Sequence, residues 1–129
     1  MSSIERVKQL RLPLDQLVVI GSGVLDALGL RTADDIDLVL SPSLFDELQQ
    51  RDDWRREQKH DEPVLYRDDV EAFLSWGSNG VPNFQALYSD GLDVQGVRFA
   101  NPTFVIDWKQ QRGSDKDLHD IQLLQRYLG

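Results

Sequence analysis

The chain has 129 residues, a length that fits one domain and is short for two. Hydrophobic residues make up 40% and charged residues 28%, a balance typical of a folded, water-soluble domain rather than of a disordered chain. The chain contains no cysteine, which excludes a disulfide framework, a thiolate zinc site and a cysteine nucleophile.

Charge and hydropathy narrow the range of partners. A formal net charge of −8 disfavours binding of nucleic acid through a broad phosphate-contacting surface. No apolar run approaches the ~20 residues of a membrane helix, and the N-terminal sequence MSSIERVKQL lacks the apolar core of a signal peptide. We therefore expect a cytoplasmic protein with no membrane partner, in keeping with the lack of cysteine.

The apolar pattern predicts helices and strands in a mixed order. In the first half of the chain we expect a helix over 3–12, a strand over 17–20, a helix over 24–28, a strand over 35–40, a helix over 41–51 and strands over 54–58, 64–66 and 70–76. In the second half we expect a helix over 83–88, a hairpin of 92–94 and 97–100, and helices over 101–111 and 114–128. This order predicts one α/β (α+β) domain over residues 1–129, with a mixed β-sheet flanked by helices.

A glycine-containing turn, Gly21-Ser22-Gly23, follows the first predicted strand and precedes a helix. The pattern resembles the start of a dinucleotide-binding fingerprint, but Asp26 occupies the third glycine position and the next strand begins too early. Backbone N–H groups of this turn and the Ser22 hydroxyl offer an anion site suited to a triphosphate. The alternative is a plain strand-to-helix turn with Ser22 as the N-cap.

Two acids, Asp35 and Asp37, stand at the head of the strand predicted over 35–40. Alternate side chains of a strand share a face, so these carboxylates would point to one side, with Cα atoms about 6.5–7 Å apart. Ile36 and Leu38 would then face the core. Paired carboxylates repel each other and resist burial, and a divalent cation such as Mg²⁺ or Mn²⁺ would relieve that conflict.

Glu71 is the single acid in the apolar strand predicted over 70–76. If this strand lies beside the strand of Asp35 and Asp37, Glu71 joins them as a metal ligand or as the base that accepts a proton from an attacking hydroxyl. The alternative is a glutamate that faces outward from a half-exposed strand.

Basic and acidic residues alternate near the C-terminus. The cations can neutralise phosphate oxygens. Ser114-x-x-Asp117 also fits a capping box, and the rest of the segment fits an ordinary solvated helix face. The residues in question are Lys109, Arg112, Lys116, Asp117 and Asp120, followed by the predicted core residues Ile121, Leu123, Leu124, Tyr127 and Leu128.

Taken together, these motifs resemble the DNA polymerase beta-like nucleotidyltransferase superfamily. The resemblance lies in Gly21-Ser22, twelve intervening residues, Asp35-Ile36-Asp37 and the later Glu71. The C-terminal basic and acidic string resembles the end of small single-domain bacterial nucleotidyltransferases, among them abortive-infection-type toxins. Glu71 departs from the aspartate that is commoner at its position.

The resemblance implies a nucleotidyltransferase fold and a metal-dependent transfer of a nucleoside monophosphate from an NTP, such as ATP, to an acceptor. It implies that Asp35, Asp37 and Glu71 are catalytic and bind Mg²⁺ or Mn²⁺. It implies a nucleotide-binding site in which Gly21 and Ser22 hold the triphosphate, Lys109, Arg112 and Lys116 steady its phosphates, and Asp117 and Asp120 position them.

The resemblance leaves the acceptor open among a small molecule, an RNA and a protein. Larger members carry a further helical domain, so we expect a second copy in a homodimer, a partner protein or an open groove to complete the acceptor site. The alternative function is an inactive nucleotidyltransferase-fold protein that binds nucleotides or a partner, for example as a toxin–antitoxin component.

Overall fold

The computed structural model describes residues 2–59, 62–76 and 82–129. The strands are β1 (Leu17–Ile20), β2 (Ile36–Leu40), β3 (Arg55–Lys59), β4 (Glu62–Arg67), β5 (Val70–Phe73), β6 (Leu92–Val94) and β7 (Val97–Phe99). The helices are α1 (Ser3–Gln9), α2 (Ser22–Ala27), α3 (Pro42–Gln49), α4 (Phe84–Ser89), α5 (Pro102–Arg112) and α6 (Asp115–Leu128), and a short 3₁₀ turn, η1 (Leu14–Gln16), precedes β1.

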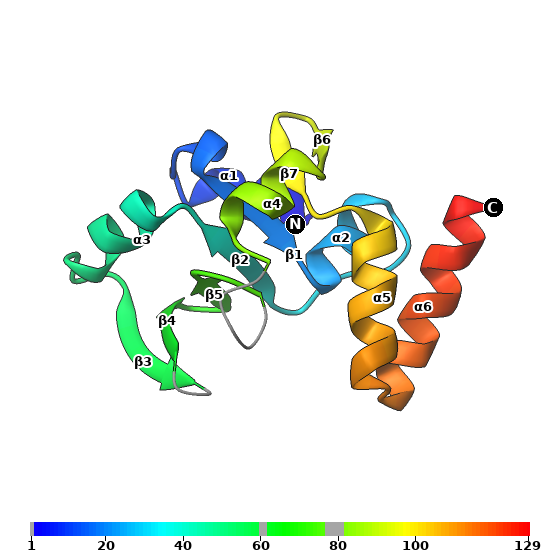
Figure 1. Ribbon diagram of the computed structural model, residues 1–129. Coiled ribbons are helices and arrows are strands. Elements are labelled where there is room, and N and C mark those ends of the chain that lie inside the picture. The colour runs from blue at the N-terminus through cyan, green and yellow to red at the C-terminus, as the bar shows by residue number, and fades with distance from the viewer. Residues whose placement is uncertain (1, 60–61, 77–81) are drawn as a thin grey trace.

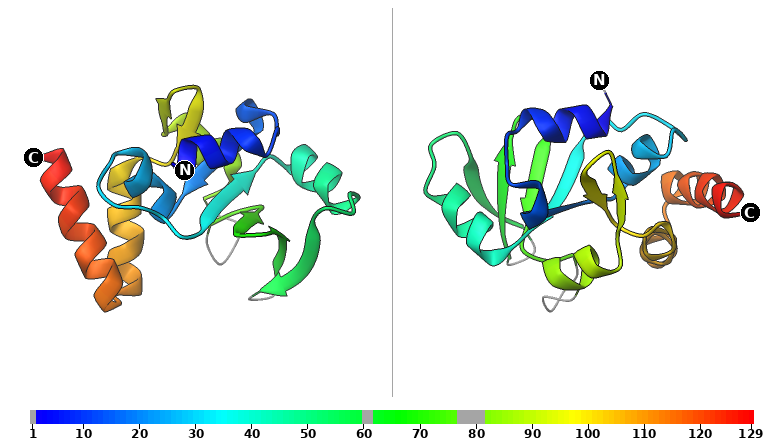
Figure 2. Two further views of the ribbon diagram at one scale, coloured as in Figure 1. Left: turned by 180° about the vertical axis from the view of Figure 1, so that it is seen from behind. Right: turned by 90° about the horizontal axis from the view of Figure 1, so that it is seen from above.

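The strands form one mixed sheet, as the sequence predicted, and the structure places them in the order β3-β4-β5-β2-β1-β7-β6 (Figure 1). The pairs β2–β5 and β1–β7 are parallel, and the other neighbours are antiparallel. Seen from above, α1 lies on one side of the sheet and α4 on the other, with α5 and α6 side by side beyond α2 (Figure 2). The parallel pair β2–β5 is the pairing that brings the two predicted acid-bearing strands together.

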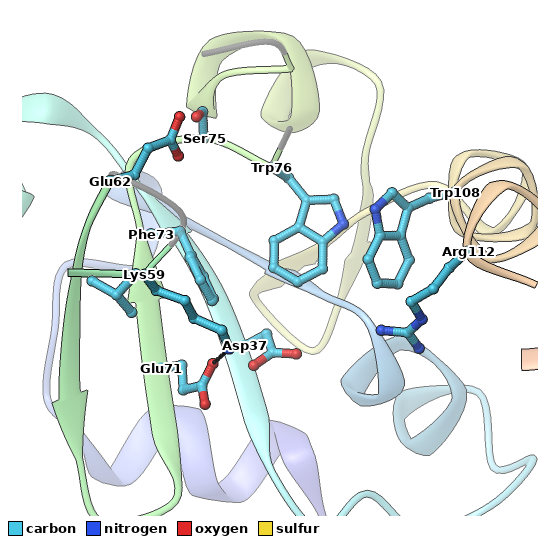
Figure 3. A pocket seen from close by; sticks show the side chains of 10 residues that line it. Asp37, Lys59, Glu62, Glu71, Phe73, Ser75, Trp76, Trp108 and Arg112 are labelled. Atoms are coloured by element: carbon cyan, nitrogen blue, oxygen red, sulfur yellow. Dashed lines mark hydrogen bonds and ion pairs between the residues drawn. The ribbon is translucent and has the colours of Figure 1, made fainter. Parts of the chain in front are cut away.

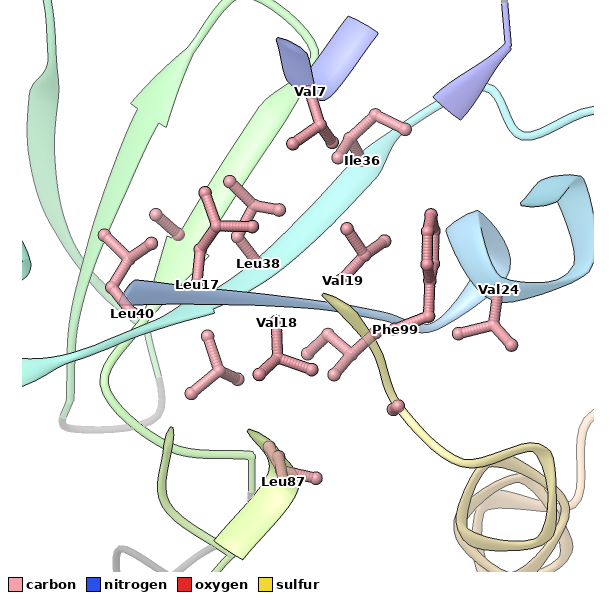
Figure 4. Close-up of a cluster of buried hydrophobic side chains, with 14 of the residues drawn as sticks. Val7, Leu17, Val18, Val19, Val24, Ile36, Leu38, Leu40, Leu87 and Phe99 are labelled. Carbon is pink, nitrogen blue, oxygen red and sulfur yellow. The ribbon is translucent and has the colours of Figure 1, made fainter. Parts of the chain in front are cut away.

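The core follows from the alternation of side chains along the central strands. Val19 of β1 and Leu38 of β2 lie on the side of the sheet that α1 covers with Val7, while Val18 faces Leu87 of α4 (Figure 4). All of these side chains are buried, and each contributes roughly 1.5–3 kcal/mol to folding. Because both faces of β1 are covered, its four residues form the continuous apolar run LVVI.

Helix boundaries follow their capping residues. Ser41 accepts a hydrogen bond from the Leu44 backbone N–H at the start of α3, and Asn101 accepts one from Thr103 at the start of α5. The predicted capping box of α6 is present, with Ser114 and Asp117 each bonding the backbone N–H of the other.

Several sequence predictions are wrong in detail. Helix α1, predicted over 3–12, ends at Gln9, and α2, predicted over 24–28, begins at Ser22. Strand β2 begins at Ile36, so Asp35 precedes the strand. Strand β5 ends at Phe73 rather than at residue 76, because the chain then turns toward α4 and bridges Ser75 to Asn83. On α6, Tyr127 and Leu128 are 50% and 51% exposed, because the last turn of this helix projects beyond α5 and α2 (Figure 1).

Within the part of the chain that the structure describes, no helix is long and apolar enough to cross a membrane.

Gly23, the second residue of α2, allows that helix to lie close against β1. A Cβ atom added at Gly23 would lie 2.6 Å from Cγ1 of Val19, a buried and branched side chain with little room to move. We expect Gly23→Ala to lower the free energy of unfolding by about 1–3 kcal/mol in urea denaturation. In a Val19→Ala background the same change should cost far less, and an equal cost in both backgrounds would contradict this packing account.

Candidate active site

The turn between β1 and α2 brings backbone close to a carboxylate. Gly21 adopts φ +65°, which favours glycine, and a Cβ atom there would lie 3.0 Å from Oδ2 of Asp37. Gly21 occupies the N-cap position of α2, and Ser22 is the first residue of the helix. The interpretation of Ser22 as an N-cap is therefore wrong. Its hydroxyl oxygen instead accepts a hydrogen bond from Nη2 of Arg31 at 2.8 Å.

Asp37 and Glu71 lie side by side because β2 and β5 pair in parallel with these two residues in register. Burial raises the pKa of Asp37 to about 7, and the negative charges of Glu71 and Asp35 add to the shift. Nζ of Lys59, on β3, lies 3.5 Å from Oε2 of Glu71 (Figure 3). Glu71 thus lines a cavity together with Asp37, rather than facing open solvent on the far face of the sheet.

Asp35 lies just before β2, exposed, in a segment held by side chains from elsewhere in the fold. Arg6 of α1 donates hydrogen bonds to the carbonyl oxygens of Ala33 and Asp34 at 2.7 and 2.8 Å. Asp26 of α2 accepts one from the Ala33 backbone N–H at 3.0 Å. These contacts fix the approach to β2, so that Asp35 lines the same cavity as Asp37 although it is outside the strand.

A divalent cation fits the chemistry of these acids. Their donors are carboxylate oxygens, the ligands that Mg²⁺ and Mn²⁺ prefer, and the raised pKa of Asp37 reflects a buried negative charge that lacks full compensation. Within residues 2–59, 62–76 and 82–129, however, no three histidine, aspartate or glutamate side chains are already gathered as a metal cluster. Asp35 and Glu71 lie on different sides of Asp37, each lining a different cavity with it.

The C-terminal acids form a buried ion-pair network with three cations. Asp117 and Asp120 are fully buried, and Lys109 is only 1% exposed. Nζ of Lys109 lies 3.4 Å from Asp117 and 3.1 Å from Asp120. Arg112 binds Asp117 through Nε and Nη2, and Arg31 binds Asp120 in the same two-pronged way at 2.6 and 2.8 Å.

The network keeps both acids ionised. Hydrogen bonds from Arg112 hold the pKa of Asp117 well below its ordinary value. Burial opposes ionisation of Asp120, but hydrogen bonds from Arg31 and Lys109 outweigh it and lower the pKa of that carboxyl. Asp117 and Asp120 are enclosed and do not line the smaller cavity, so they contact the cations rather than the space beside them.

Two cavities meet at Asp37, Trp108 and Arg112. The smaller, of about 190 Å³, gathers most of the predicted residues. It is lined by Gly21, Ser22, Asp35, Asp37, Lys109, Arg112 and Lys116, together with Asp34 and Trp108. The sequence motifs thus converge in space, with carboxylates on one wall and cations on another.

The larger cavity, of about 440 Å³, extends from Glu71 along the open side of β3, β4 and β5. Its aromatic wall consists of Phe73, Trp76 and Trp108, with Trp76 centred 5.0 Å from Phe73 and 4.8 Å from Trp108 (Figure 3). The guanidinium of Arg112 lies 4.3 Å from the Trp108 ring centre, on the boundary of the two cavities. Trp76 and Trp108 therefore form part of the wall of this pocket.

Sequence reasoning missed Arg31, Asp26, Arg6 and Lys59, which contact the predicted residues or the backbone around them. Arg31 gave no local signal, because its partner Asp120 lies 89 residues away in sequence. Lys59 gave none either, since it lies in a run of charged residues on an exposed strand.

Similarity to solved structures identifies the fold. Over 96% of this chain and 30% of the other, the structure resembles the Megavirus polyadenylate synthase, with a TM-score of 0.58 and 14% identity. It resembles ANT(2'')-Ia in complex with adenylyl-2''-tobramycin over 99% of this chain and 86% of the other, with a TM-score of 0.59 and 17% identity. A solution structure of the antibiotic-resistance factor ANT(2'')-Ia matches with a TM-score of 0.54 at 17% identity, over 98% of this chain and 80% of the other.

The chain therefore has the nucleotidyltransferase fold, as its motifs predicted. No family model matches the sequence, and no curated protein sequence matches it. Since the polyadenylate synthase is much longer, the chain spans less than a third of that neighbour.

Asp37 should make the fold less stable as the pH rises. With a native pKa of about 7 and an ordinary value of 3.8, its contribution to stability is complete below about pH 4 and is lost as the pH rises through 7. We expect Asp37→Asn to raise the free energy of unfolding by about 2–4 kcal/mol at pH 8 and by less than half as much at pH 5.

Urea denaturation at the two pH values measures this difference. Asp46→Asn, at an exposed position on α3, is the matched control and should change stability by less than about 0.5 kcal/mol at both. A stabilisation by Asp37→Asn that is the same at pH 5 and pH 8 would contradict the raised pKa.

Proposed function

We propose that this protein transfers a nucleoside monophosphate from an NTP to an acceptor hydroxyl or phosphate. The observation that carries the proposal is the smaller cavity, in which the Gly21-Ser22 turn, the acids Asp35 and Asp37 and the cations of α5 and α6 face one another. A cavity with carboxylates on one side and cations on the other suits a metal-bound polyphosphate better than either a bare anion or a bare cation.

In this proposal the cations hold the donor. Lys109 and Arg112 contact the phosphate oxygens, and their own carboxylate partners fix their positions. Lys116, at the start of α6, adds a third positive charge on the cavity wall. Gly21 lets the turn approach the phosphates closely, because it adds no side chain between them and Asp37.

Asp35, Asp37 and Glu71 are the residues that would hold Mg²⁺ or Mn²⁺, which when bound would stabilise the charge on the attacking and leaving oxygens. In this proposal Glu71 also accepts the proton of the acceptor hydroxyl, since it lies beside Asp37 and lines the larger cavity. In that role it must first release Lys59.

The larger cavity receives the groups that flank the transferred phosphate. Its volume of about 440 Å³ lies within the range of small-molecule sites, and its aromatic wall offers apolar surface to a nucleoside or an acceptor. This cavity supports the open groove among the three expected ways of completing the acceptor site. A second copy or a partner protein, and the choice among small-molecule, RNA and protein acceptors, stay predictions, as does the cytoplasmic location.

A binding module without turnover is the second candidate, and a specific observation favours it. Glu71 is paired with Lys59, and no three acids are already gathered in the described part of the chain. A protein that binds a nucleotide through its cations needs no such cluster. The toxin–antitoxin role belongs with this candidate.

Transfer of label from α-labelled NTPs to acceptors in a cell extract, with Mg²⁺ present, tests the proposal. ATP is the first donor to try, because the named neighbours include a polyadenylate synthase and a complex with an adenylylated product. We expect Asp37→Asn to reduce transfer by at least about 100-fold, and Glu71→Gln to reduce it by about 10²–10⁴-fold if Glu71 is the base.

Asp46→Asn on α3 is the matched control and should transfer label like the wild type. Thermal shift with the same NTPs separates the two candidates. Magnesium-dependent stabilisation by a nucleotide without any transfer would favour the binding module, whereas no stabilisation by any NTP would count against both.

A further inference from the structure

We propose that Arg31 is a positioning residue, which orients the Ser22 hydroxyl toward a bound polyphosphate and ties it to the cations of α5. The inference rests on the proposed function, because it concerns how the same site holds the phosphates of an NTP. Neither the motif resemblance nor the fold comparison assigns a role to this arginine.

Arg31 joins two parts of the fold that are 89 residues apart in sequence. It lies in the connection between α2 and β2, and its Nε and Nη2 atoms donate to the two oxygens of Asp120 on α6 at 2.6 and 2.8 Å. Nη2 also donates to Oγ of Ser22 at 2.8 Å. Its Nη1 atom donates to the Thr32 carbonyl oxygen, so the guanidinium is held from several directions.

The contact with Arg31 determines what the Ser22 hydroxyl can do. Because Oγ accepts from the guanidinium, its own proton must point elsewhere. Within the described parts of the chain Ser22 donates to no acceptor, and its side chain lines the smaller cavity beside Lys109 and Arg112. A hydroxyl fixed in this way is ready to donate to a phosphate oxygen.

The same guanidinium also sets the position of Lys109. Asp120 is fully buried and shares its charge between Arg31 and Lys109, whose Nζ lies 3.1 Å away. Without Arg31, Asp120 would be paired with Lys109 alone. A buried carboxylate that has lost one of its partners destabilises the fold. Arg31 therefore controls two groups on the wall of the cavity, the hydroxyl directly and the ammonium through Asp120.

A lysine cannot replace this arginine. The contacts to both oxygens of Asp120 and to Ser22 need the planar fork of a guanidinium, with one Nη2 atom serving both partners. An ammonium keeps the charge, and so keeps Asp120 paired, but it cannot hold Ser22 at the same time. Arg31→Lys therefore removes the contact that positions Ser22 while it keeps the positive charge.

Binding of inorganic tripolyphosphate in the presence of Mg²⁺, measured by calorimetry well below the melting temperature of each variant, tests the inference. We expect Arg31→Lys and Ser22→Ala each to weaken binding by about tenfold, the loss of one hydrogen bond to a charged group. The double variant should bind within about threefold of the weaker single variant, because both changes remove the same contact. Ser22→Thr, which keeps the hydroxyl, should restore most of the affinity.

Arg51→Lys is the matched control, since Arg51 makes the same two-pronged contact with Asp53 on the surface beyond α3. It should bind tripolyphosphate like the wild type. A merely structural role for Arg31 would lower the melting temperature and leave the affinity and its dependence on Ser22 unchanged.

The outcomes are distinct. If the wild type binds tripolyphosphate and Arg31→Lys binds it equally well, or if the two changes are additive, the positioning role is overturned while the proposed function stands. If the wild type does not bind tripolyphosphate, both fall. If no Arg31 variant folds, Ser22→Ala decides, because wild-type affinity in that variant overturns the role assigned to the hydroxyl.

Discussion

Two buried carboxylates on α6 determine where most of the cations of the candidate site lie. Asp117 and Asp120 have no access to water, so each must be compensated by cations within the protein. The cations come from α5 and from the connection before β2, and pairing draws these segments together around one helix. The wall that faces the smaller cavity is therefore a consequence of balancing buried charge, and the positions of Lys109 and Arg112 follow from it.

The acidic side of the site follows the opposite rule. Asp37 and Glu71 are brought together by strand register, and their charges oppose each other. Because Gly21 has no side chain, the turn lies close to Asp37 and excludes some of the water that would otherwise stabilise the charge of this carboxylate. The fold tolerates this because β1 and the rest of β2 are buried and apolar. The acidic wall carries charge that is not balanced and the cationic wall is balanced, which supports the proposal that a charged ligand binds between them.

Most of the fold could be predicted from local sequence patterns. The features that depend on contacts between residues far apart in sequence could not. LVVI predicts β1 because a strand covered on both faces is apolar throughout, and Ser114-x-x-Asp117 predicts the start of α6 through its capping box. Asp35 falls outside β2 because Arg6 holds the preceding backbone from another helix, which no periodicity reveals. The partnership of Arg31 with Asp120 is equally invisible, since it depends on how α6 packs.

The outermost strand, β3, reads Arg-Arg-Glu-Gln-Lys and is exposed along its whole length. A free strand edge is a template for pairing with another chain, and a row of charged side chains raises the cost of such pairing. At the opposite edge, β6 is only three residues long. Both margins of the sheet thus resist edge-to-edge aggregation. A second copy of this chain that joined it would have to do so through helices or loops rather than by extending the sheet.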